Sequence, residues 1–493
     1  MYSLREVIPK VKLGNIIKGM DTISIRGNTS LEITGITKDS RNVSEGHLFF
    51  VTQVSGAYTE DAFKRGASAV VTDGEITEPF GCVVYVGDVM KALGQAASNF
   101  YHHPARKAHI TGITGTNGKT TTTYLIESIV RSAGKEPGVI GTISYRYAGN
   151  TFKAANTTPG ASEINSLLND MVNTGVSNVI MEVSSHALHQ ARVEGIDFDV
   201  AIFTNLTHDH LDYHGTFEDY GASKRLLFED HLARSKKKKR YAIMNIDDPS
   251  IRDFVIAAPV TMLSYSTRGF ADACLSEYSE SIDGLTLTIN LPGRKIPIVS
   301  PLIGMFNASN ILAAALSGYA TGISHHAIKE GIERLNGVPG RLERVPNDRG
   351  ISVFVDYAHT PDAIKNVLSI LGRLKKGRLI IVFGCGGNRD AAKRPIMGAL
   401  SSRLADEIII TSDNPRNENP QQIIAEIARG VVGKRYRIIE DRREAIFESI
   451  RTARPDDVVL VAGKGHEDYQ IVGDSILHFS DREVVEEYFH VAT

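Results

Sequence analysis

The stretch from Ile110 to Val130, ITGITGTNGKTTTTYLIESIV, constrains the fold more than any other part of the chain. A short run of β-branched apolar residues is followed by closely spaced glycines, Lys119, four threonines and an amphipathic segment. This order predicts a strand, a tight turn and a helix. Because glycines let backbone N–H groups point into the turn and the helix begins with unpaired N–H donors, we expect a cradle for an anion.

The residues that close this turn indicate which anion the cradle holds. Lys119 would place a positive charge on the outer phosphates of a nucleotide, and the hydroxyl of Thr120 is placed to bind Mg²⁺. The loop is a variant, since Ile113 stands where the standard phosphate loop has its first glycine. A glycine-rich turn that only joins a strand to a helix is the alternative, but GKT between a strand and a helix favours phosphate binding.

Length and composition bound the class of protein. At 493 residues the chain has room for about three domains. Its net charge of −2 gives no general attraction to nucleic acid or anionic membranes. The three cysteines are far apart, so we expect neither disulfides nor a cysteine metal site. Charges interrupt the start of the chain and no run of about 18 apolar residues follows, so we expect a soluble cytoplasmic protein without membrane insertion.

Three regions with strand and helix signals follow one another along the chain. Residues 1–107 alternate short β-like runs with helical segments, and Pro104 marks a boundary because proline disfavours helix in the residue before it. In residues 108–337 and again in 338–493, apolar strand candidates alternate with amphipathic helices, which is typical of parallel sheets covered on both faces. We predict an α/β protein of three domains, with a central phosphate-loop parallel-sheet ATPase domain and a C-terminal Rossmann-like domain.

Two strand candidates of the central region end on residues that can bind metal. In open α/β sheets ligands collect at the carboxyl ends of the strands, so these ends should lie near Lys119 and Thr120. One run stops at Glu182, whose carboxylate can bind Mg²⁺ directly or through water. The next run stops just before Thr207–His210. A buried, hydrogen-bonded structural glutamate is the alternative interpretation of Glu182.

The histidine-rich segment His208–His214 also suggests a different class of protein. Its HxHxD opening is similar to that of dinuclear zinc hydrolases, in which imidazoles and carboxylates hold Zn²⁺ and an activated water. Against this interpretation, Tyr213 separates Asp212 from His214, and a zinc site would leave the phosphate loop unexplained. A nucleotide-binding module without ligase activity is a further alternative.

The strand candidates of the last region also end in polar, glycine-rich sequence. So many charged and amide side chains at strand ends are not expected by chance. For a single member, the alternative role is to cap a helix or to stabilise a loop. For Asp413 and Asn414, turn formation explains the residue type about equally well. The residues at these ends are Asp356, His359, Arg389, Asp413, Asn414, Arg416, Lys464, His466 and Glu467.

Ten short motifs, in order along the chain, resemble the Mur ligase family. The resemblance is weaker before residue 108, where KDSRNVSEGHLFF (38–50) matches but SGAYTEDAF (55–63) replaces the usual Asp-Gly tract. The ten motifs are GTNGKT (115–120), EVSSHAL (182–188), TNLTHDHLDYHG (204–215), YGASK (220–224), GMFNASN (304–310), GVPGRLE (337–343), DYAHTPD (356–362), GCGGNRD (384–390), DNPR (413–416) and GKGHEDYQ (463–470).

The resemblance implies three domains in series that bind a UDP-linked substrate, ATP and an incoming amino acid, with the last domain closing over the others. It also implies ATP-dependent amide formation, in which a carboxylate attacks the γ-phosphate and an amine then displaces phosphate from the acyl phosphate. This step brings anions together, so catalysis should rest on positioning and on charge neutralisation by Lys119 and Mg²⁺. Thr120 and Glu182 would hold one Mg²⁺, and His210 would help hold a second.

The same resemblance assigns roles to further residues. Lys224 would be carbamylated, which turns an ammonium that repels metal into an oxygen ligand, and a plain surface lysine is the alternative. Arg192 would contact the substrate, with a structural salt bridge as the alternative. ATP would meet Gly115, Thr116, Asn117, Gly118, Lys119, Thr120 and Thr121, with Asn307 at the adenine, Asp356 at the ribose, Arg341 at the phosphates and His359 nearby. UDP-MurNAc-L-Ala-D-Glu would meet Ser40, Thr157, Thr158, Ser184, Gln190 and Arg192.

The tetrapeptide DNPR indicates which amino acid is added. It resembles the form associated with meso-diaminopimelate, whereas lysine-adding relatives usually lack the arginine. Diaminopimelate differs from lysine by one distal carboxylate, with which the guanidinium of Arg416 can pair bidentately. We therefore expect meso-diaminopimelate as the amino acid, with L-lysine as the alternative, and we expect a monomer. The amino acid would meet Arg389, Asp413, Asn414, Arg416, Gly463 and Glu467.

Overall fold

The computed structural model describes residues 10–53 and 58–491. The chain forms two compact units. The first consists of residues 1–275, 290–296 and 309–332, and the second of residues 276–289, 297–308 and 333–493. These units do not test the expected division into three domains at 1–107, 108–337 and 338–493, which stays a prediction.

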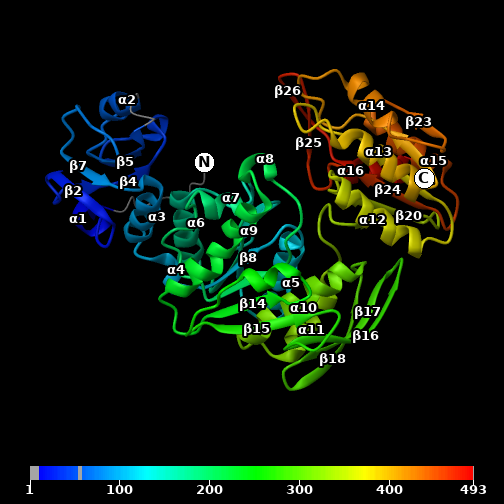
Figure 1. The fold of residues 1–493 in the computed structure, drawn as a ribbon, viewed down its shortest axis with the longest axis horizontal. Helices are drawn as coiled ribbons and strands as arrows, with labels where there is room; N and C mark the ends of the chain where they lie inside the picture. Colours follow the sequence, from blue (N-terminus) through cyan, green and yellow to red (C-terminus); the bar gives the residue numbers. More distant parts are fainter. Residues whose placement is uncertain (1–9, 54–57, 492–493) are drawn as a thin grey trace. The chain divides into compact units, whose positions relative to one another are not determined.

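The first unit begins with a five-stranded sheet (Figure 1). Strands β4 to β7 run parallel, and β2 pairs antiparallel with β7 at one edge. Phe49 and Phe50 of β5 point to opposite faces, as strand pleating requires, and each is buried in its own cluster. Helix α3 contributes to the cluster of Phe50, and helix α2 to that of Phe49. The elements are β2 (Thr22–Gly27), β4 (Gly35–Thr37), β5 (His47–Val51), α2 (Thr59–Lys64), β6 (Ala69–Thr72), β7 (Cys82–Val86) and α3 (Val89–Phe100), with α1 (Leu13–Ile16) and the short pair β1 (Val11–Lys12) and β3 (Glu32–Ile33).

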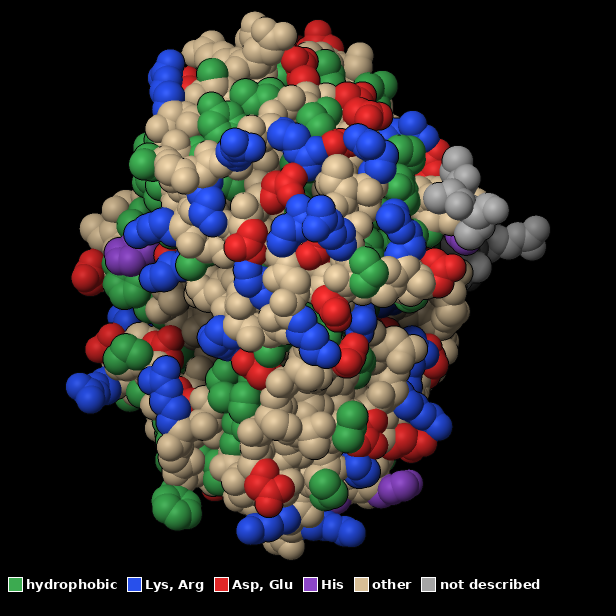
Figure 2. All heavy atoms as spheres, turned by 90° about the vertical axis from the view of Figure 1, so that its right-hand side faces the viewer, with side chains coloured by type: hydrophobic (Ala, Val, Ile, Leu, Met, Phe, Trp, Pro, Cys, Tyr) green, Lys and Arg blue, Asp and Glu red, His purple; other side chains and the backbone are tan. Residues whose placement is uncertain are grey.

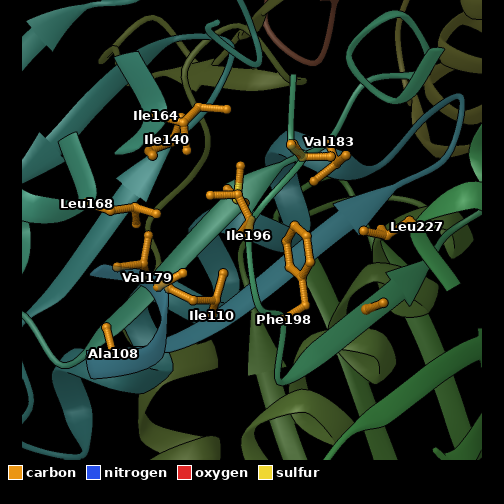
Figure 3. Packing of buried hydrophobic residues seen from close by; sticks show 14 of the residues in the cluster. Ala108, Ile110, Ile140, Ile164, Leu168, Val179, Val183, Ile196, Phe198 and Leu227 are labelled. Atoms are coloured by element: carbon orange, nitrogen blue, oxygen red, sulfur yellow. The ribbon is translucent and has the colours of Figure 1, made fainter. Parts of the chain in front are cut away.

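A second sheet of this unit carries the phosphate loop. Its order is β11-β10-β9-β12-β8-β13-β14-β15, and it runs on into β16, β17 and β18, whose residues are divided between the two units. The strands from β9 across to β16 pair in parallel, while β10 and β11 are antiparallel. Ile110, Val179 and Phe198 pack in one cluster, which Figure 3 shows from close by. The strands are β8 (His109–Thr114), β9 (Pro137–Ile140), β10 (Ser144–Tyr147), β11 (Asn150–Lys153), β12 (Asn178–Glu182), β13 (Val200–Phe203), β14 (Tyr241–Asn245), β15 (Thr261–Ser266), β16 (Ala273–Ser281), β17 (Gly284–Leu291) and β18 (Arg294–Ser300).

The register of the parallel strands brings their carboxyl ends to one edge. Glu182, the last residue of β12, stands beside Ile113 of β8, and Phe203, the last residue of β13, stands beside Thr114. The strand ends that the sequence indicated therefore flank the start of the phosphate loop. The helices between residues 104 and 334 are α4 (Pro104–Lys107), α5 (Lys119–Ser132), α6 (Ala161–Asn173), α7 (Ser185–His189), α8 (Leu211–His214), α9 (Phe217–Leu226), a π-helical turn (Leu227–Leu232), α10 (Met305–Ala320) and α11 (His325–Arg334).

The second unit contains a six-stranded sheet in the order β19-β20-β24-β21-β22-β23. Neighbouring strands are parallel except β19 and β20. Helices α12 to α14 pack into one apolar cluster and helices α15 and α16 into another, so that the sheet is covered on both faces. This doubly covered sheet confirms the predicted α/β class. The elements are β19 (Glu343–Val345), β20 (Ser352–Asp356), α12 (Pro361–Leu374), β21 (Leu379–Phe383), α13 (Lys393–Leu404), β22 (Glu407–Ile410), α14 (Pro420–Ala428), β23 (Tyr436–Ile438), α15 (Arg442–Thr452), β24 (Val458–Ala462), β25 (Tyr469–Val472), β26 (Ser475–His478) and α16 (Asp481–Val491).

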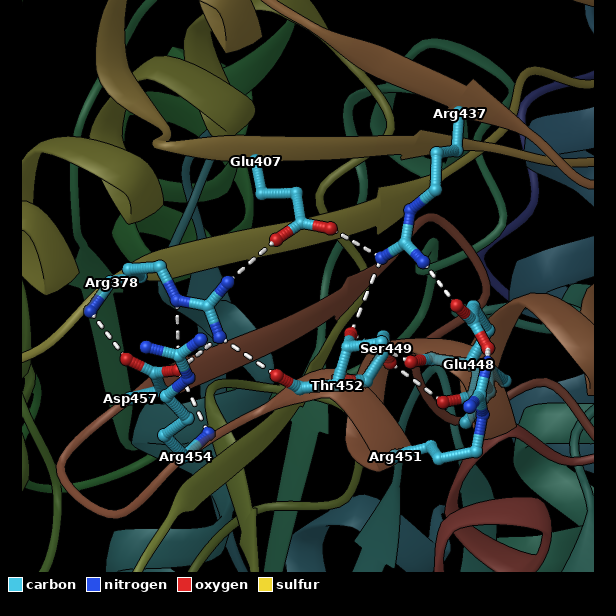
Figure 4. A network of polar contacts seen from close by, with 10 residues as sticks. Arg378, Glu407, Arg437, Glu448, Ser449, Arg451, Thr452, Arg454 and Asp457 are labelled. Carbon is cyan, nitrogen blue, oxygen red and sulfur yellow. Dashed lines mark hydrogen bonds and ion pairs between the residues drawn. The ribbon is translucent and has the colours of Figure 1, made fainter.

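Charged side chains of both signs are interspersed on the molecular face in Figure 2, in keeping with the net charge of −2. An ordered network of such charges lies at the amino ends of the six-stranded sheet (Figure 4). Arg378, just before β21, donates to Asp457, just before β24, at 2.7 Å and to Glu407, at the start of β22, at 3.0 Å. Arg437 of β23 donates to Glu407 and to Glu448 of α15. The network ties four strands together at the end opposite to the sequence motifs.

Asp457 is the most buried member of this network, and we predict that Asp457→Asn lowers the free energy of unfolding by about 2 kcal/mol at pH 7, because it weakens a charge-assisted pair. Burial alone would raise the pKa of the Asp457 carboxyl, but hydrogen bonds led by that from Arg378 hold the pKa below its usual value. A carboxyl with a lowered folded pKa contributes stability above its unfolded pKa of about 3.9 and loses it as the pH falls through the folded value.

The loss in free energy of unfolding caused by Asp457→Asn should therefore be largest at pH 7 and should shrink below about pH 4. Urea unfolding at several pH values measures it, with Asp456→Asn as the matched control on an exposed neighbour. An Asp457→Asn deficit of the same size at pH 3 and pH 7 would contradict this explanation.

Candidate active site

The phosphate loop has the predicted form, a turn between strand β8 and helix α5. Gly115 and Gly118 have φ angles of +148° and +87°, which residues with a Cβ rarely adopt. A Cβ at Gly115 would lie 1.9 Å from Thr204 Oγ1, and a Cβ at Gly118 would lie 2.4 Å from Asn310 Oδ1. Both positions therefore require glycine, first because of the positive φ angle and second because neighbouring atoms leave no space for a Cβ.

Two lysines meet at this loop. Lys119 Nζ donates to the carbonyl oxygens of Gly115, at 2.8 Å, and Thr116, at 2.9 Å. Lys224 Nζ, from α9, donates to the same Gly115 oxygen at 2.9 Å. Lys224 is 2% exposed, so the alternative of a plain surface lysine is wrong. Burial, together with the charge of Lys119, holds the pKa of the Lys224 amine well below its usual value, which favours the neutral amine.

Glu182 is the buried acid of the site, with 1% of its surface exposed. Thr120 Oγ1 donates to Glu182 Oε2 at 3.0 Å. Thr142 donates to both carboxylate oxygens, from its backbone N to Oε1 at 3.0 Å and from Oγ1 to Oε2 at 2.9 Å. Glu182 forms no ion pair with any of the residues that the structure describes. The side-chain donors to this carboxylate are neutral hydroxyls. Its charge acts on Arg146, because burial alone would lower the pKa of that guanidinium and Glu182 helps to raise it.

The imidazole of His210 belongs to the same environment. His210 precedes helix α8 in the left-handed conformation, with φ of +53°. Partial burial lowers the pKa of His210, Asp209 opposes this, and the charges of Lys119 and Lys224 lower it further. The influence of both lysines places His210 near the loop, as the strand-end argument predicts. A neutral imidazole can serve as a metal ligand.

The zinc alternative finds no matching geometry among residues 10–53 and 58–491. Within them, one group of histidine and carboxylate side chains has its ligand atoms within 4.8 Å of one another, namely Glu194, Asp230 and His231. Arg234 already donates to Glu194 and lies 3.2 Å from His231 Nδ1. The histidines of the HxHxD segment do not gather in this way, so the fold gives the hydrolase interpretation no support.

Four residues expected to contact the dipeptide are joined by hydrogen bonds beside Glu182. Thr158 Oγ1 donates to the Glu182 carbonyl at 2.8 Å and accepts from the Ser184 N–H at 3.0 Å. Arg192 donates to the Thr158 carbonyl at 2.8 Å and to Gln190 Oε1 at 2.7 Å. Arg192 pairs with no carboxylate of the described chain, so the structural salt bridge proposed as its alternative role is not formed there.

The remaining two residues of that expected set, Thr157 and Ser40, make other contacts. Thr157 Oγ1 lies 3.1 Å from Thr142 Oγ1. Ser40 is buried at the start of a short 3₁₀ helix, and its hydroxyl hydrogen-bonds to Asp61. Burial and, secondly, the charge of Arg192 lower the pKa of Lys38, two residues before Ser40.

The second unit holds the other residues expected to contact ATP. Asp356 ends strand β20, and its carboxylate accepts two backbone N–H groups at 2.6 and 2.8 Å. Burial raises the pKa of Asp356, while Arg341 opposes this shift. The Arg341 guanidinium lies 5.0 Å from the ring centroid of Tyr357, and the His359 ring contacts the Tyr357 carbonyl at 2.8 Å. The buried Asn307 donates to a backbone carbonyl at 2.8 Å. These contacts position the side chains, and their roles toward ATP stay predictions.

The residues expected to bind the amino acid largely gather in the second unit. Asn414 Nδ2 donates to Glu467 Oε2 at 3.0 Å. The buried Lys464 donates to both side chains, at 3.3 Å each. Gly463 lies so close to Asp413 that a Cβ would stand 2.7 Å from Asp413 Oδ2. The motifs DNPR and GKGHE therefore form one polar cluster.

Two arginines converge beside this cluster. A Cβ on Gly386 would lie 2.9 Å from Arg416 Nη1 and 3.8 Å from Arg389 Cγ. Arg416 Nη1 donates to the Gly387 carbonyl at 2.8 Å. Arg416 also lines a cavity of about 630 Å³. Its guanidinium pairs with no carboxylate of the described residues, which leaves it able to bind one from a substrate.

Sequence reasoning missed two side chains of the first site. Tyr220 OH lies 3.0 Å from Thr116 Oγ1, and Lys224 Nζ lies 4.3 Å from the centroid of its ring. Thr142 contacts Glu182 as described above. A signal for Thr142 existed, because it follows the end of strand β9 by two residues and the strand-end rule was not applied there. No sequence pattern pointed to Tyr220 beyond its place in YGASK.

Two domain families match this chain. The Mur ligase middle domain matches residues 113–318, and the Mur ligase, glutamate ligase domain, matches residues 340–465. The UDP-N-acetylmuramoyl-L-alanyl-D-glutamate--2,6-diaminopimelate ligase of Geobacter metallireducens is 44% identical, over 96% of this chain and 98% of that protein. The ligase of the same name from Bacillus cereus is 41% identical, over 97% of this chain and 98% of that protein.

Solved structures agree with these matches. A UDP-N-acetylmuramoyl-L-alanyl-D-glutamate--2,6-diaminopimelate ligase is similar with a TM-score of 0.72 and 32% identity, over 98% of this chain and 99% of that chain. A Mycobacterium tuberculosis folylpolyglutamate synthase complexed with ADP has a TM-score of 0.62 and 18% identity, over 75% of this chain and 91% of that chain, which shows a shared fold alone. With relatives above 40% identity along nearly its whole length, this chain belongs to the Mur ligase family.

Proposed function

We propose that the protein is an ATP-dependent ligase that joins meso-diaminopimelate to UDP-MurNAc-L-Ala-D-Glu during peptidoglycan precursor synthesis. One observation carries the nucleotide part: the hydroxyl of Thr120 in the phosphate loop donates at 3.0 Å to Glu182, a buried carboxylate that ends the neighbouring parallel strand. The relatives that align with 96% and 97% of the chain carry the name of this reaction, which supports the choice of substrates.

The donor set beside the phosphate loop fits Mg²⁺. The Thr120 hydroxyl and the Glu182 carboxylate are oxygen ligands, which Mg²⁺ prefers, and the carboxylate forms no ion pair with any of the described residues. These two residues would hold one Mg²⁺, and His210 with Lys224 would help hold a second. When bound, Mg²⁺ neutralises charge on the phosphates and so lowers the repulsion toward an attacking carboxylate.

Lys224 would serve as a ligand after carbamylation. A neutral amine attacks the carbon of CO₂, forms an N–C bond and releases one proton, which leaves a carbamate anion. The buried, pKa-lowered amine of Lys224 is suited to this reaction because it does not first have to lose a proton to water. Carbamylation would then turn a neutral amine beside Lys119 into a negatively charged oxygen ligand.

The residues of the two sites would bind the substrates and position their reacting groups. Arg192 and Thr158 would hold the dipeptide so that its terminal carboxylate attacks the γ-phosphate, while Lys119 binds the phosphates of ATP. The amine of the amino acid would then attack the acyl carbon, and the C–O bond to phosphate would break. Thr157, Ser184, Gln190 and Ser40 would complete the substrate site, and Asn307, Arg341, Asp356 and His359 would hold ATP.

Arg416 would select the amino acid, with Arg389, Asp413, Asn414, Gly463 and Glu467 around it. A distal carboxylate would satisfy its guanidinium, whereas lysine would leave that guanidinium unpaired beside an ammonium-bearing chain. A site built for a polar group can reject an analogue that lacks the group by about 10⁴-fold. L-Lysine is therefore the weaker candidate.

The chain is proposed to act as a monomer in the cytoplasm. All the assigned residues come from one chain, and both proposed substrates are charged, water-soluble molecules. In the described part of the chain, no helix has the length and apolar character needed to cross a membrane. A binding module that uses nucleotide without ligation is the competing function, and phosphate release that depends on an amino acid separates the two.

Removing the guanidinium of Arg416 tests the choice of amino acid. Arg416→Ala should lower kcat/KM for meso-diaminopimelate by about 1,000-fold, because a substrate carboxylate loses its bidentate partner, with little change in KM for ATP. Phosphate release with UDP-MurNAc-L-Ala-D-Glu and a panel of amino acids measures this. Arg429→Ala, which removes an exposed guanidinium of the same unit, is the matched control. Equal use of lysine and diaminopimelate by the unmodified protein would refute the assignment.

Carbamylation of Lys224 can be observed directly. Protein equilibrated with ¹³C-bicarbonate should show a carbamate carbon resonance that is absent from Lys224→Arg. The exposed Lys239→Arg should keep the resonance and so controls for other amines. Failure of the unmodified protein to show any such signal near neutral pH would remove Lys224 from the metal ligands.

A further inference from the structure

Thr142 makes a contact with Glu182 that the proposed roles leave unexplained. It lies in the turn after strand β9 and donates to both carboxylate oxygens, from its N–H at 3.0 Å and from its hydroxyl at 2.9 Å. The turn approaches so closely that a Cβ on Gly141 would lie 2.6 Å from Glu182 Oε1. Thr142 thus donates to both oxygens of the carboxylate, and Gly141 allows this close approach because it has no side chain.

These hydrogen bonds matter because no charged side chain of the described residues donates to the Glu182 carboxylate. The hydroxyl of Thr120 is the remaining side-chain donor to this carboxylate in the described chain, at 3.0 Å. Once the Thr120 oxygen ligates a cation, its hydroxyl geometry is set by the metal, so Thr142 alone would fix the orientation of the acid. A buried carboxylate whose donors are lost pays a desolvation cost and turns away from the productive geometry.

Thr142 also reaches the segment expected to hold the dipeptide. Its Oγ1 lies 3.1 Å from Thr157 Oγ1, and a hydroxyl has a single proton to donate. Since the Thr142 proton goes to Glu182, the Thr157 hydroxyl must donate to Thr142. The hydrogen bonds therefore run in one direction, from Thr157 through Thr142 to Glu182, and such chains strengthen one another.

We propose that Thr142 is a positioning residue that orients the Glu182 carboxylate for Mg²⁺ and couples this orientation to Thr157. The proposal rests on the proposed function for its ligand, a divalent cation held with nucleotide beside the phosphate loop. A second hydrogen bond joins the same two segments, because the Thr158 hydroxyl donates to the backbone carbonyl of Glu182 at 2.8 Å. Binding at the 157–158 segment and cation binding at Glu182 would then influence each other.

The test is the affinity for Mg²⁺, measured by calorimetry on the full chain saturated with ADP. Thr142→Val keeps the shape and the backbone N–H bond but removes the hydroxyl, and it should weaken Mg²⁺ binding about 10-fold. Thr142→Ser should restore affinity to within about threefold of the unmodified protein. ADP binding in EDTA should stay unchanged in both variants. Thr151→Val, at an exposed position of strand β11, is the matched control.

The coupling has its own readout. Thr157→Val should weaken Mg²⁺ binding about threefold, and the double variant Thr142→Val/Thr157→Val should be no weaker than Thr142→Val, because the chain is already broken. Fully additive effects would overturn the coupling. Unchanged Mg²⁺ affinity in Thr142→Val, or no rescue by serine in a protein of unchanged melting temperature, would overturn the positioning role.

A separate measurement distinguishes an error in the role of Thr142 from an error in the proposed ligase function. Ligase activity is measured on the unmodified protein as amino-acid-dependent phosphate release. If that activity is absent while Thr142→Val still loses Mg²⁺ affinity, the substrates are wrong and the role of Thr142 holds. If the activity is present and Thr142→Val binds Mg²⁺ normally, the role of Thr142 is wrong and the ligase assignment holds.

Discussion

The first unit depends on how charge is arranged at the carboxyl edge of its parallel sheet. Glu182 is buried with neutral partners, and two lysine side chains share the Gly115 carbonyl. The carboxylate forms no ion pair with the described residues, while burial and the charge of Lys119 favour the neutral amine of Lys224. Bound phosphates would pair with Lys119, and a divalent cation would pair with the acid. The edge thus brings an acid and a lysine together where a nucleotide and its metal would bind.

The sheet of the second unit uses its two ends differently. At the amino ends, Arg378 and Arg437 pair with carboxylates of the chain itself, so these charges hold strands together. At the carboxyl ends, Arg416 donates to a backbone carbonyl instead. An arginine whose partner is only a carbonyl oxygen can exchange it for a carboxylate at a gain in energy. The same residue type therefore stabilises the fold at one end and is suited to recognition at the other.

Much of this arrangement could be predicted from the sequence, because strand ends in a parallel sheet share an edge. Lys119 and Glu182 follow apolar runs, so their common location needed only the topology. Thr142 was missed because its role depends on a turn that brings two of its donor atoms within hydrogen-bond distance of an acid 40 positions later. The burial of Lys224 was likewise not visible, since its helix carries charged and small residues that predict a surface. Its proposed modification came from resemblance, and the structure supplies the physical reason, a buried amine beside a second cation.

The central claim is that a substrate carboxylate attacks the γ-phosphate of a nucleotide held by Lys119. Isotope transfer tests this step directly. UDP-MurNAc-L-Ala-D-Glu labelled with ¹⁸O in its terminal side-chain carboxylate is turned over with ATP and meso-diaminopimelate, and the released phosphate is analysed by mass spectrometry. An acyl phosphate predicts one ¹⁸O atom in each phosphate formed. Phosphate without label, at equal amounts of amide product, would contradict the account.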